Sequence, residues 1–329
     1  MNNGNRPVQG IDWNHPVDQI DKEVWDRLKA NFWVPEKVPL SNDLPAWGRL
    51  TPEQKTALKR VFGGLTMLDT LQSEVGAPVM QADAENKHEA AVFANITFME
   101  AIHAQSYSAI FSTFCSSQEI DEIFRWIEHE PLLQNKGQIV RSVYRGNTDF
   151  YNDGEAFQKA IKKAVSVLLE SFLFYSGFYL PLKFSSEALM TNTADIIRLI
   201  MRDEGVHGYY IGYKYQGLRA RLNEADRNAL DALVFDLAKE LLRNEEKYSD
   251  KLYQGTPYIS KAKSYLRYNY NKAMDNLGYR DKHLDNATPE SAILSQMAID
   301  ANETHDFFSG SGSSYVVGKV EETNDDDWA

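Results

Sequence analysis

One stretch of apolar residues limits what this chain can fold into. Residues 164–182 read AVSVLLESFLFYSGFYLPL, and Glu170 is the only charged residue among them. The run approaches the length of a membrane-spanning helix, but Glu170, Pro181 and several Ser and Gly residues interrupt it, and no second span accompanies it. A helix that is apolar on all sides is typical of the centre of a globular bundle. We therefore expect other helices, and not a membrane, to surround this one.

Helical periodicity covers most of the remaining chain. The segment LTPEQK at 50–55 predicts a helix start, because Thr51 can act as the N-cap, Pro52 fits the first turn and Gln54 completes a capping box. Alternation typical of strands is scarce, so we expect an all-α chain. The helices that we expect cover residues 51–74, 86–113, 118–145, 156–180, 192–219, 223–252 and about 260–277.

The sequence predicts a helical domain over residues 1–285 and a C-terminal tail over residues 286–329. Helical periodicity fades from about Asn286, and FFSGSGSSYVVGKVEETNDDDWA at 307–329 is rich in Gly and Ser and then acidic. Such a composition is typical of a flexible segment. We expect this tail to carry isolated aromatic side chains.

Charge and cysteine content narrow the class of function. The formal net charge of −12 argues against a nucleic-acid partner. Cys115 is the only cysteine, which excludes a disulfide framework and a cysteine-rich metal site and fits a reducing cytosol. The N-terminal MNNGNRPVQG has no signal-peptide pattern. We therefore expect a cytoplasmic protein.

Residues 98–107, FMEAIHAQSY, place polar side chains on an apolar helical stripe. At 100° per residue, Glu100, His103 and Tyr107 share this stripe with Phe93 and Phe111. A buried carboxylate costs several kcal/mol, in order of magnitude, unless it is paired or bound to a metal. A single Glu-x-x-His is a weak signal, since it also describes an ordinary surface pair.

Three further helices carry matching acids. Residues 202–212, RDEGVHGYYIG, contain a second Glu-x-x-His in Glu204 and His207, and Asp69 and Glu170 are single acids on apolar helix faces. Carboxylates and Glu-x-x-His motifs from four helices form the ligand pattern of di-iron and di-manganese carboxylate bundles. Four carboxylates balance two divalent cations, and oxygen and imidazole donors suit iron or manganese. The sequence therefore predicts a ferritin-like helical bundle with a dimetal site in a four-helix core and additional helices around it.

Tyr107 lies one helical turn beyond His103 on the same stripe. Most such tyrosines are core residues with a satisfied hydroxyl. Beside two metal ions that reach high oxidation states, Tyr107 is instead a candidate for one-electron oxidation, and its Phe and Ile neighbours provide the dry surroundings that a radical needs.

The chain resembles the small, radical-carrying β subunit of class I ribonucleotide reductase, and class Ib most closely. The segments that carry this resemblance extend over essentially the whole chain and read NFWVPEKVPLSND, GLTMLDTLQ, FMEAIHAQSYS, LLESFLFYSGFYLP, RDEGVHGYYIGYK and HDFFSGSGSSYVVGK.

The resemblance implies a ligand set and a cofactor. Asp69, Glu100 and His103 would hold one metal ion, and the second would be held by Glu170, Glu204 and His207. Carboxylates would bridge the two ions, and Tyr107 would carry the stable radical. The cofactor would be two Mn or two Fe ions per chain, with manganese activated through a flavodoxin-like protein that supplies the oxidant.

The resemblance also implies a route for the radical and a set of partners. The radical would pass from His103 or its metal through Asp203 and Trp33 to Tyr315 in the tail. The chain would form a homodimer, and its tail would dock on the large α subunit, which brings the ribonucleotide and the cysteines that this chain lacks. The expected activity is ribonucleoside-diphosphate reduction, carried out only with that subunit.

Some features depart from the family, and other readings exist. Gly205 replaces a small alanine, the loop at 144–157 is longer than usual, and the end DDDWA lacks a terminal aromatic residue.

A di-iron oxygenase or desaturase is one alternative, but Asp69, Tyr107 and the aromatic tail argue against it. A ferritin-like metal-binding protein would be shorter and would not need Trp33 or Asp203. A purely structural bundle leaves Glu170 unexplained.

Overall fold

The computed structural model describes residues 8–146 and 154–304, with side chains up to residue 297, and within these ranges it contains helices and no strand. The all-α prediction is therefore confirmed. The helices are α1 Gln19–Ala30, α2 Leu44–Arg49, α3 Pro52–Leu71, α4 Ala77–Ala82, α5 Lys87–Phe114, α6 Ser117–His129, α7 Pro131–Tyr144, α8 Glu155–Leu168, α9 Tyr175–Ser186, α10 Thr191–Arg221, α11 Glu224–Leu252, α12 Ile259–Leu277 and α13 Ser291–Thr304.

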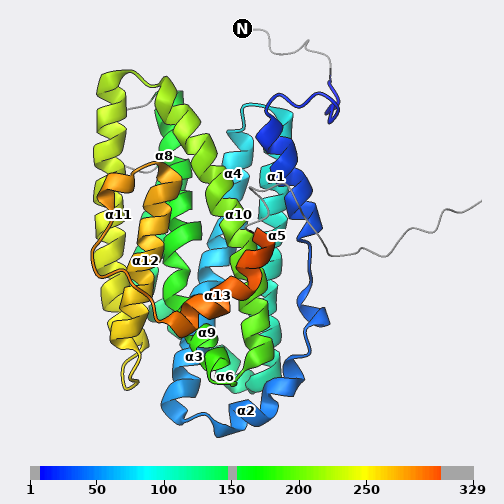
Figure 1. Cartoon of the computed structure of the whole chain (residues 1–329), viewed down its shortest axis with the longest axis vertical. Coiled ribbons are helices and arrows are strands. Elements are labelled where there is room, and N and C mark those ends of the chain that lie inside the picture. The colour runs from blue at the N-terminus through cyan, green and yellow to red at the C-terminus, as the bar shows by residue number, and fades with distance from the viewer. Residues whose placement is uncertain (1–7, 147–153, 305–329) are drawn as a thin grey trace, which may run out of the picture.

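Long helices run side by side along the molecule, with α10 among them and α13 lying obliquely across the bundle (Figure 1). α10 packs against α8 and α9, and α3 packs against α5. The predicted helix start at residue 51 is confirmed, since the Thr51 side chain accepts from Gln54 N and the Gln54 side chain accepts from Thr51 N. This capping box fixes the start of α3, the helix that carries Asp69.

Two of the helices that we expected to be continuous are interrupted in the structure. The helix expected over 118–145 is two helices, α6 and α7, that meet at Glu130 and Pro131. The helix expected over 156–180 is α8, a π-turn over Leu169–Leu173, and α9. A second π-turn, Gln72–Gly76, joins α3 to α4. The π-turn at 169–173 contains the predicted ligand Glu170, and the π-turn at 72–76 begins three residues after the predicted ligand Asp69.

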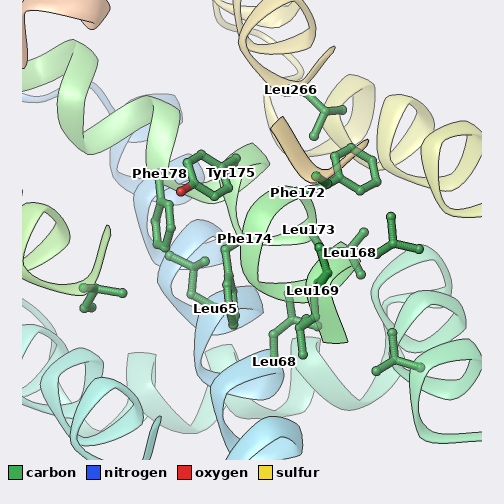
Figure 2. Close-up of a cluster of buried hydrophobic side chains, with 14 of the residues drawn as sticks. Leu65, Leu68, Leu168, Leu169, Phe172, Leu173, Phe174, Tyr175, Phe178 and Leu266 are labelled. Atoms are coloured by element: carbon green, nitrogen blue, oxygen red, sulfur yellow. The ribbon is translucent and has the colours of Figure 1, made fainter. Parts of the chain in front are cut away.

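The apolar run at 164–182 forms the centre of the core. Figure 2 shows Leu65 and Leu68 of α3 beside Phe174 and Leu169 of this run. α3 and α9 approach closely at Gly177, because a Cβ there would lie 2.9 Å from the Leu65 side chain. By length and composition alone, residues 155–186 could cross a membrane, but their most apolar window is entirely buried inside the protein. Such burial is the property of a core helix.

The segment predicted as a tail begins with ordered contacts. Ile293 of α13 is fully buried, Gln296 accepts a hydrogen bond from Arg198, and Glu290 accepts one from Tyr179 at 2.9 Å. The first part of residues 286–329 therefore packs on the bundle. Tyr315 and the rest of residues 305–329 lie outside the described residues, as do residues 147–153 of the loop predicted at 144–157.

Candidate metal centre

Four helical segments bring the predicted ligands together in the core. Asp69 comes from the last turn of α3, Glu170 comes from the π-turn at 169–173, and α5 and α10 each supply a Glu-x-x-His pair. All six side chains have a relative exposure of 1% or less, and they are Asp69, Glu100, His103, Glu170, Glu204 and His207.

The six side chains form two overlapping sets of candidate ligands. Within each set, one donor atom per residue lies within 4.8 Å of the donor atoms of the others, and the sets are Asp69, Glu100, His103 and Glu204, and Glu100, Glu170, Glu204 and His207. Glu204 places Oε1 3.1 Å from His103 Nδ1 and Oε2 3.3 Å from His207 Nδ1. Glu100 likewise reaches both imidazoles, at 3.7 and 2.9 Å. Glu100 and Glu204 therefore belong to both sets, which is the position that a carboxylate shared by two ions would take.

The hydrogen bonding of this cluster fits a metal pair. Both carboxylate oxygens of Asp69, Glu100 and Glu204 are buried without a hydrogen-bond partner, as are Nδ1 of His103 and of His207. Buried polar atoms are normally paired, and orphaned carboxylates carry a large desolvation cost. Two divalent cations would supply both the missing partners and the charge that balances four carboxylates. Oxygen and imidazole donors without thiolate suit manganese or iron.

Burial and mutual repulsion set the protonation of the cluster. Burial, and then the charge of Glu100, raises the pKa of Asp69 and of Glu170. Burial lowers the pKa of His103, but the nearby carboxylates of Asp203 and Asp69 outweigh it and raise this pKa overall. The cluster without metal therefore holds protons among its carboxylates and imidazoles, and metal binding displaces them.

Tyr107 lies in the dry interior next to this cluster. Its side chain is fully buried, its hydroxyl has no hydrogen-bond partner, and the ring of Phe62 stacks 6.1 Å away. Burial, and then the negative charges of Asp69 and Glu204, raises the pKa of Tyr107. The phenol therefore stays protonated, and water has no access to it.

Trp33 and Asp203 extend the cluster beyond His103. Trp33 Nε1 donates to Asp203 Oδ2 at 2.8 Å, and the same oxygen lies 3.2 Å from His103 Nε2. The Trp33 ring also stacks on the His103 ring with centroids 5.9 Å apart. The structure thus joins these three residues in one continuous contact chain, while Tyr315 is outside the described part.

Sequence reasoning missed three polar residues behind Glu170. Gln72 Nε2 donates to Glu170 Oε1 and to Ser166 Oγ, and Tyr144 donates to Gln72 Oε1. Gln72 follows Asp69 by three residues on the same face of an apolar helix, so its spacing was a usable signal. Ser166 and Tyr144 had no such signal, because their contact with Gln72 depends on tertiary packing.

An all-α bundle with two sets of carboxylate and histidine ligands inside a four-helix core defines a dimetal carboxylate protein of the ferritin-like type. The family model for the ribonucleotide reductase small chain matches residues 10–289. The chain therefore belongs to the ribonucleotide reductase small-chain family, and the resemblance predicted from its sequence is confirmed.

Individual relatives agree over nearly the whole chain. The chain is 52% identical to ribonucleoside-diphosphate reductase 2 subunit beta of Escherichia coli K12 over 322 residues, which cover 98% of both proteins. It is 53% identical to ribonucleoside-diphosphate reductase subunit beta of Mycobacterium leprae, covering 98% of this chain and 96% of that protein. The crystal structure of dimanganese(II)-NrdF from Streptococcus sanguinis matches with a TM-score of 0.82 and 43% identity, covering 88% of this chain and all of the other.

Proposed function

We propose that this chain is the small, radical-storing subunit of a ribonucleoside-diphosphate reductase, and that it stores the radical on Tyr107. The observation that carries the proposal is the cluster of six fully buried ligand side chains, with orphaned donor atoms, next to a fully buried tyrosine. The names of the relatives support the same reaction class.

The metal pair is held by Asp69, Glu100 and His103 on one side and by Glu170, Glu204 and His207 on the other. When bound, it supplies the one-electron oxidising power that the chain itself lacks. We propose manganese as the metal, with iron able to occupy the same ligands. The oxygen and nitrogen donors suit both metals, and the Streptococcus sanguinis relative is a dimanganese protein.

The role of Tyr107 follows from its surroundings. Oxidation removes one electron and the hydroxyl proton, and Asp69 is the carboxylate whose charge acts most strongly on this phenol. We propose Asp69 as the group that takes that proton. The resulting radical is shielded by Phe62 and by the absence of any exposed surface, so small reductants cannot reach it.

Radical transfer uses the contact chain from His103 through Asp203 to Trp33. Asp203 Oδ2 contacts both the His103 imidazole and the Trp33 indole N–H, at 3.2 and 2.8 Å. This single oxygen can take the indole proton when Trp33 is oxidised, which couples proton movement to electron movement. We propose that Tyr315, at the far end of the sequence, continues the route to the large subunit.

The proposed partners follow from what the chain lacks. Cys115 is its only cysteine, so the large subunit must bring the thiols that reduce the ribonucleotide. We propose that the chain pairs with a second copy of itself, docks on that subunit through its C-terminal residues, and receives its oxidant from a flavodoxin-like protein in the cytoplasm.

Electron paramagnetic resonance (EPR) tests the radical assignment. Protein loaded with manganese and activated, or loaded with iron and exposed to oxygen, is expected to give a tyrosyl-radical signal. The Tyr107→Phe variant should lose that signal and still bind two metal ions, because no ligand is changed. Tyr253→Phe is the matched control, since Tyr253 is also fully buried but bonds Ser176 O, away from the cluster. A radical signal that persists in Tyr107→Phe would contradict the assignment.

A further inference from the structure

A buried amide lies directly behind one of the proposed metal ligands. Gln72 begins the π-turn after α3, one helical turn beyond Asp69. Its Nε2 donates to Glu170 Oε1 and, at 2.9 Å, to the hydroxyl of Ser166 on α8. Gln72, Ser166 and Glu170 are all fully buried. The amide and the carboxylate therefore interact in a dry environment, where hydrogen bonds to a charged group are strong.

The orientation of this amide is fixed from its other side. The Tyr144 hydroxyl, at the last residue of α7, donates to Gln72 Oε1 at 2.7 Å. Burial raises the pKa of Tyr144, so its hydroxyl keeps the proton that it donates. A flipped amide would turn Oε1 toward the Glu170 carboxylate, which repels it. We refer to Gln72, Tyr144 and Ser166 as the Gln72 network.

Gly76 leaves room for this network because it has no side chain. A Cβ on Gly76 would lie 2.0 Å from Gln72 Oε1 and 2.6 Å from the Tyr144 ring. Because real Cβ atoms do not approach other atoms so closely, any other residue at 76 would displace the Gln72 amide or the Tyr144 ring. The π-turn at 72–76 is thus shaped around the contact between Gln72 and Tyr144.

Because of the Gln72 network, the hydrogen bonding of Glu170 differs from that of Glu100 and Glu204, the two carboxylates that belong to both ligand sets. Both oxygens of Glu100 and of Glu204 lack hydrogen-bond partners. In Glu170, Oε1 accepts from Gln72, and only Oε2 is without a partner; it lies 3.9 Å from His207 Nδ1. One oxygen of Glu170 is therefore engaged away from the cluster.

We propose that Gln72 is a positioning residue that makes Glu170 a one-oxygen ligand. Its amide holds Oε1 away from the metal pair, so that Oε2 alone faces the ions, and Tyr144 and Ser166 hold the amide. Without Gln72, Glu170 can turn both oxygens toward the ions. This inference rests on the proposed metal centre.

The test measures metal binding and carboxylate geometry, not turnover. Full-length wild type and Gln72→Leu are titrated with Mn(II), with free Mn(II) followed by EPR, and infrared spectra of 13C-glutamate protein are compared with and without Mn(II). We expect the separation between the asymmetric and symmetric carboxylate stretches to narrow for one glutamate in the variant. One of the two ions should also bind about 10–100-fold more weakly.

Two further variants keep the test decisive. Tyr144→Phe retains the ring and frees the Gln72 amide to rotate, so it should give the same band change in smaller amplitude, even if Gln72→Leu does not fold. Asn244→Leu is the control, because Asn244 is a buried amide on α11 that bonds Leu132 O at 2.9 Å, far in sequence from every ligand. It should leave the bands and both affinities unchanged.

The outcomes separate this inference from the function on which it rests. If the carboxylate bands of Gln72→Leu and Tyr144→Phe are identical to those of wild type, the role of Gln72 is overturned, whether or not the affinity for Mn(II) falls. A merely structural residue would weaken Mn(II) binding without changing how Glu170 binds the ion. Failure of wild type to bind two Mn(II) ions would instead contradict the proposed metal centre.

Discussion

The two imidazoles of the centre have different surroundings. His103 Nε2 lies 3.2 Å from Asp203 Oδ2, whereas His207 Nε2 has no hydrogen-bond partner among the described residues. A proton on His103 Nε2 leaves Nδ1, which faces the carboxylates, as the free lone pair. Asp203 therefore fixes the tautomer of one histidine only. The sequence indicated all six candidate ligands, four through the two Glu-x-x-His spacings and two as single acids on apolar helix faces. Asp203 and Trp33 were predicted only through family resemblance, because their contact joins residues far apart in the chain.

Cys115 is expected to be a slow thiol. Burial, and then the charge of Glu119, raises the pKa of Cys115 to about 11. Because the thiolate is the reactive form, a shift of about two units lowers its fraction near pH 8 by roughly 100-fold. Alkylation by iodoacetamide, followed by mass spectrometry, should be slower by about this factor than alkylation of an unfolded Cys115 peptide. The rate should rise about tenfold per pH unit up to about pH 11. Alkylation at the peptide's rate would refute this environment.

At the scale of helices, the π-turns are what the sequence could not predict. Each inserts an extra residue into a helical turn, and such turns are frequent at functional sites. Every residue of 164–182 is buried, so no polar stripe marks the phase of the helix or its change. The prediction of helical structure over 156–180 is therefore correct, but the prediction of one continuous helix is wrong. In contrast, the capping box at Thr51 was predictable, because its signal is local.

Gly205 allows a test of helix propensity beside a ligand. It is exposed on α10, and a Cβ there would meet no atom within 4 Å. Gly205→Ala should raise the free energy of unfolding of the metal-free protein by about 0.4–1 kcal/mol, measured by urea denaturation, because Ala loses less chain entropy. Metal stoichiometry should not change.

Gly212 on the same helix provides the opposite control. A Cβ there would lie 2.4 Å from the backbone oxygen of Asn276 on α12. Gly212→Ala should therefore destabilise the protein, since a backbone atom cannot move aside cheaply. A Gly205→Ala variant that is less stable than wild type would mean that α10 does not tolerate Ala beside Glu204.

At the scale of the whole molecule, the outer face of α5 is unusual for a surface. From Ala90 to Phe114 the only acidic or basic residue apart from His103 is Glu100, and both are buried. Phe98 is 50% exposed and stacks on Phe32, which is 49% exposed, with ring centroids 6.1 Å apart. Uncharged faces with exposed aromatic residues are typical of protein interfaces. We expect this face to form the contact between two copies of the chain.

Charge placed on this face should weaken the proposed homodimer. In a two-fold interface each substitution occurs twice, so Phe98→Lys is expected to raise the dimer dissociation constant at least about tenfold, measured by analytical ultracentrifugation. Phe124→Lys on α6 is the control, since Phe124 is also an exposed phenylalanine, at 42%. Equal dissociation constants for Phe98→Lys and wild type would place the interface elsewhere.

The positions of the ligands along the chain have a consequence for biosynthesis. Asp69 is near the beginning of the ligand set, and His207 closes it only after α10 has been made. A nascent chain therefore lacks both complete candidate ligand sets until Glu204 and His207 have been added and α3, α5, α10 and the π-turn at 169–173 have assembled. We therefore expect a metal ion to find a complete ligand set only after synthesis has passed His207, so metal binding follows the assembly of these helices and does not guide it.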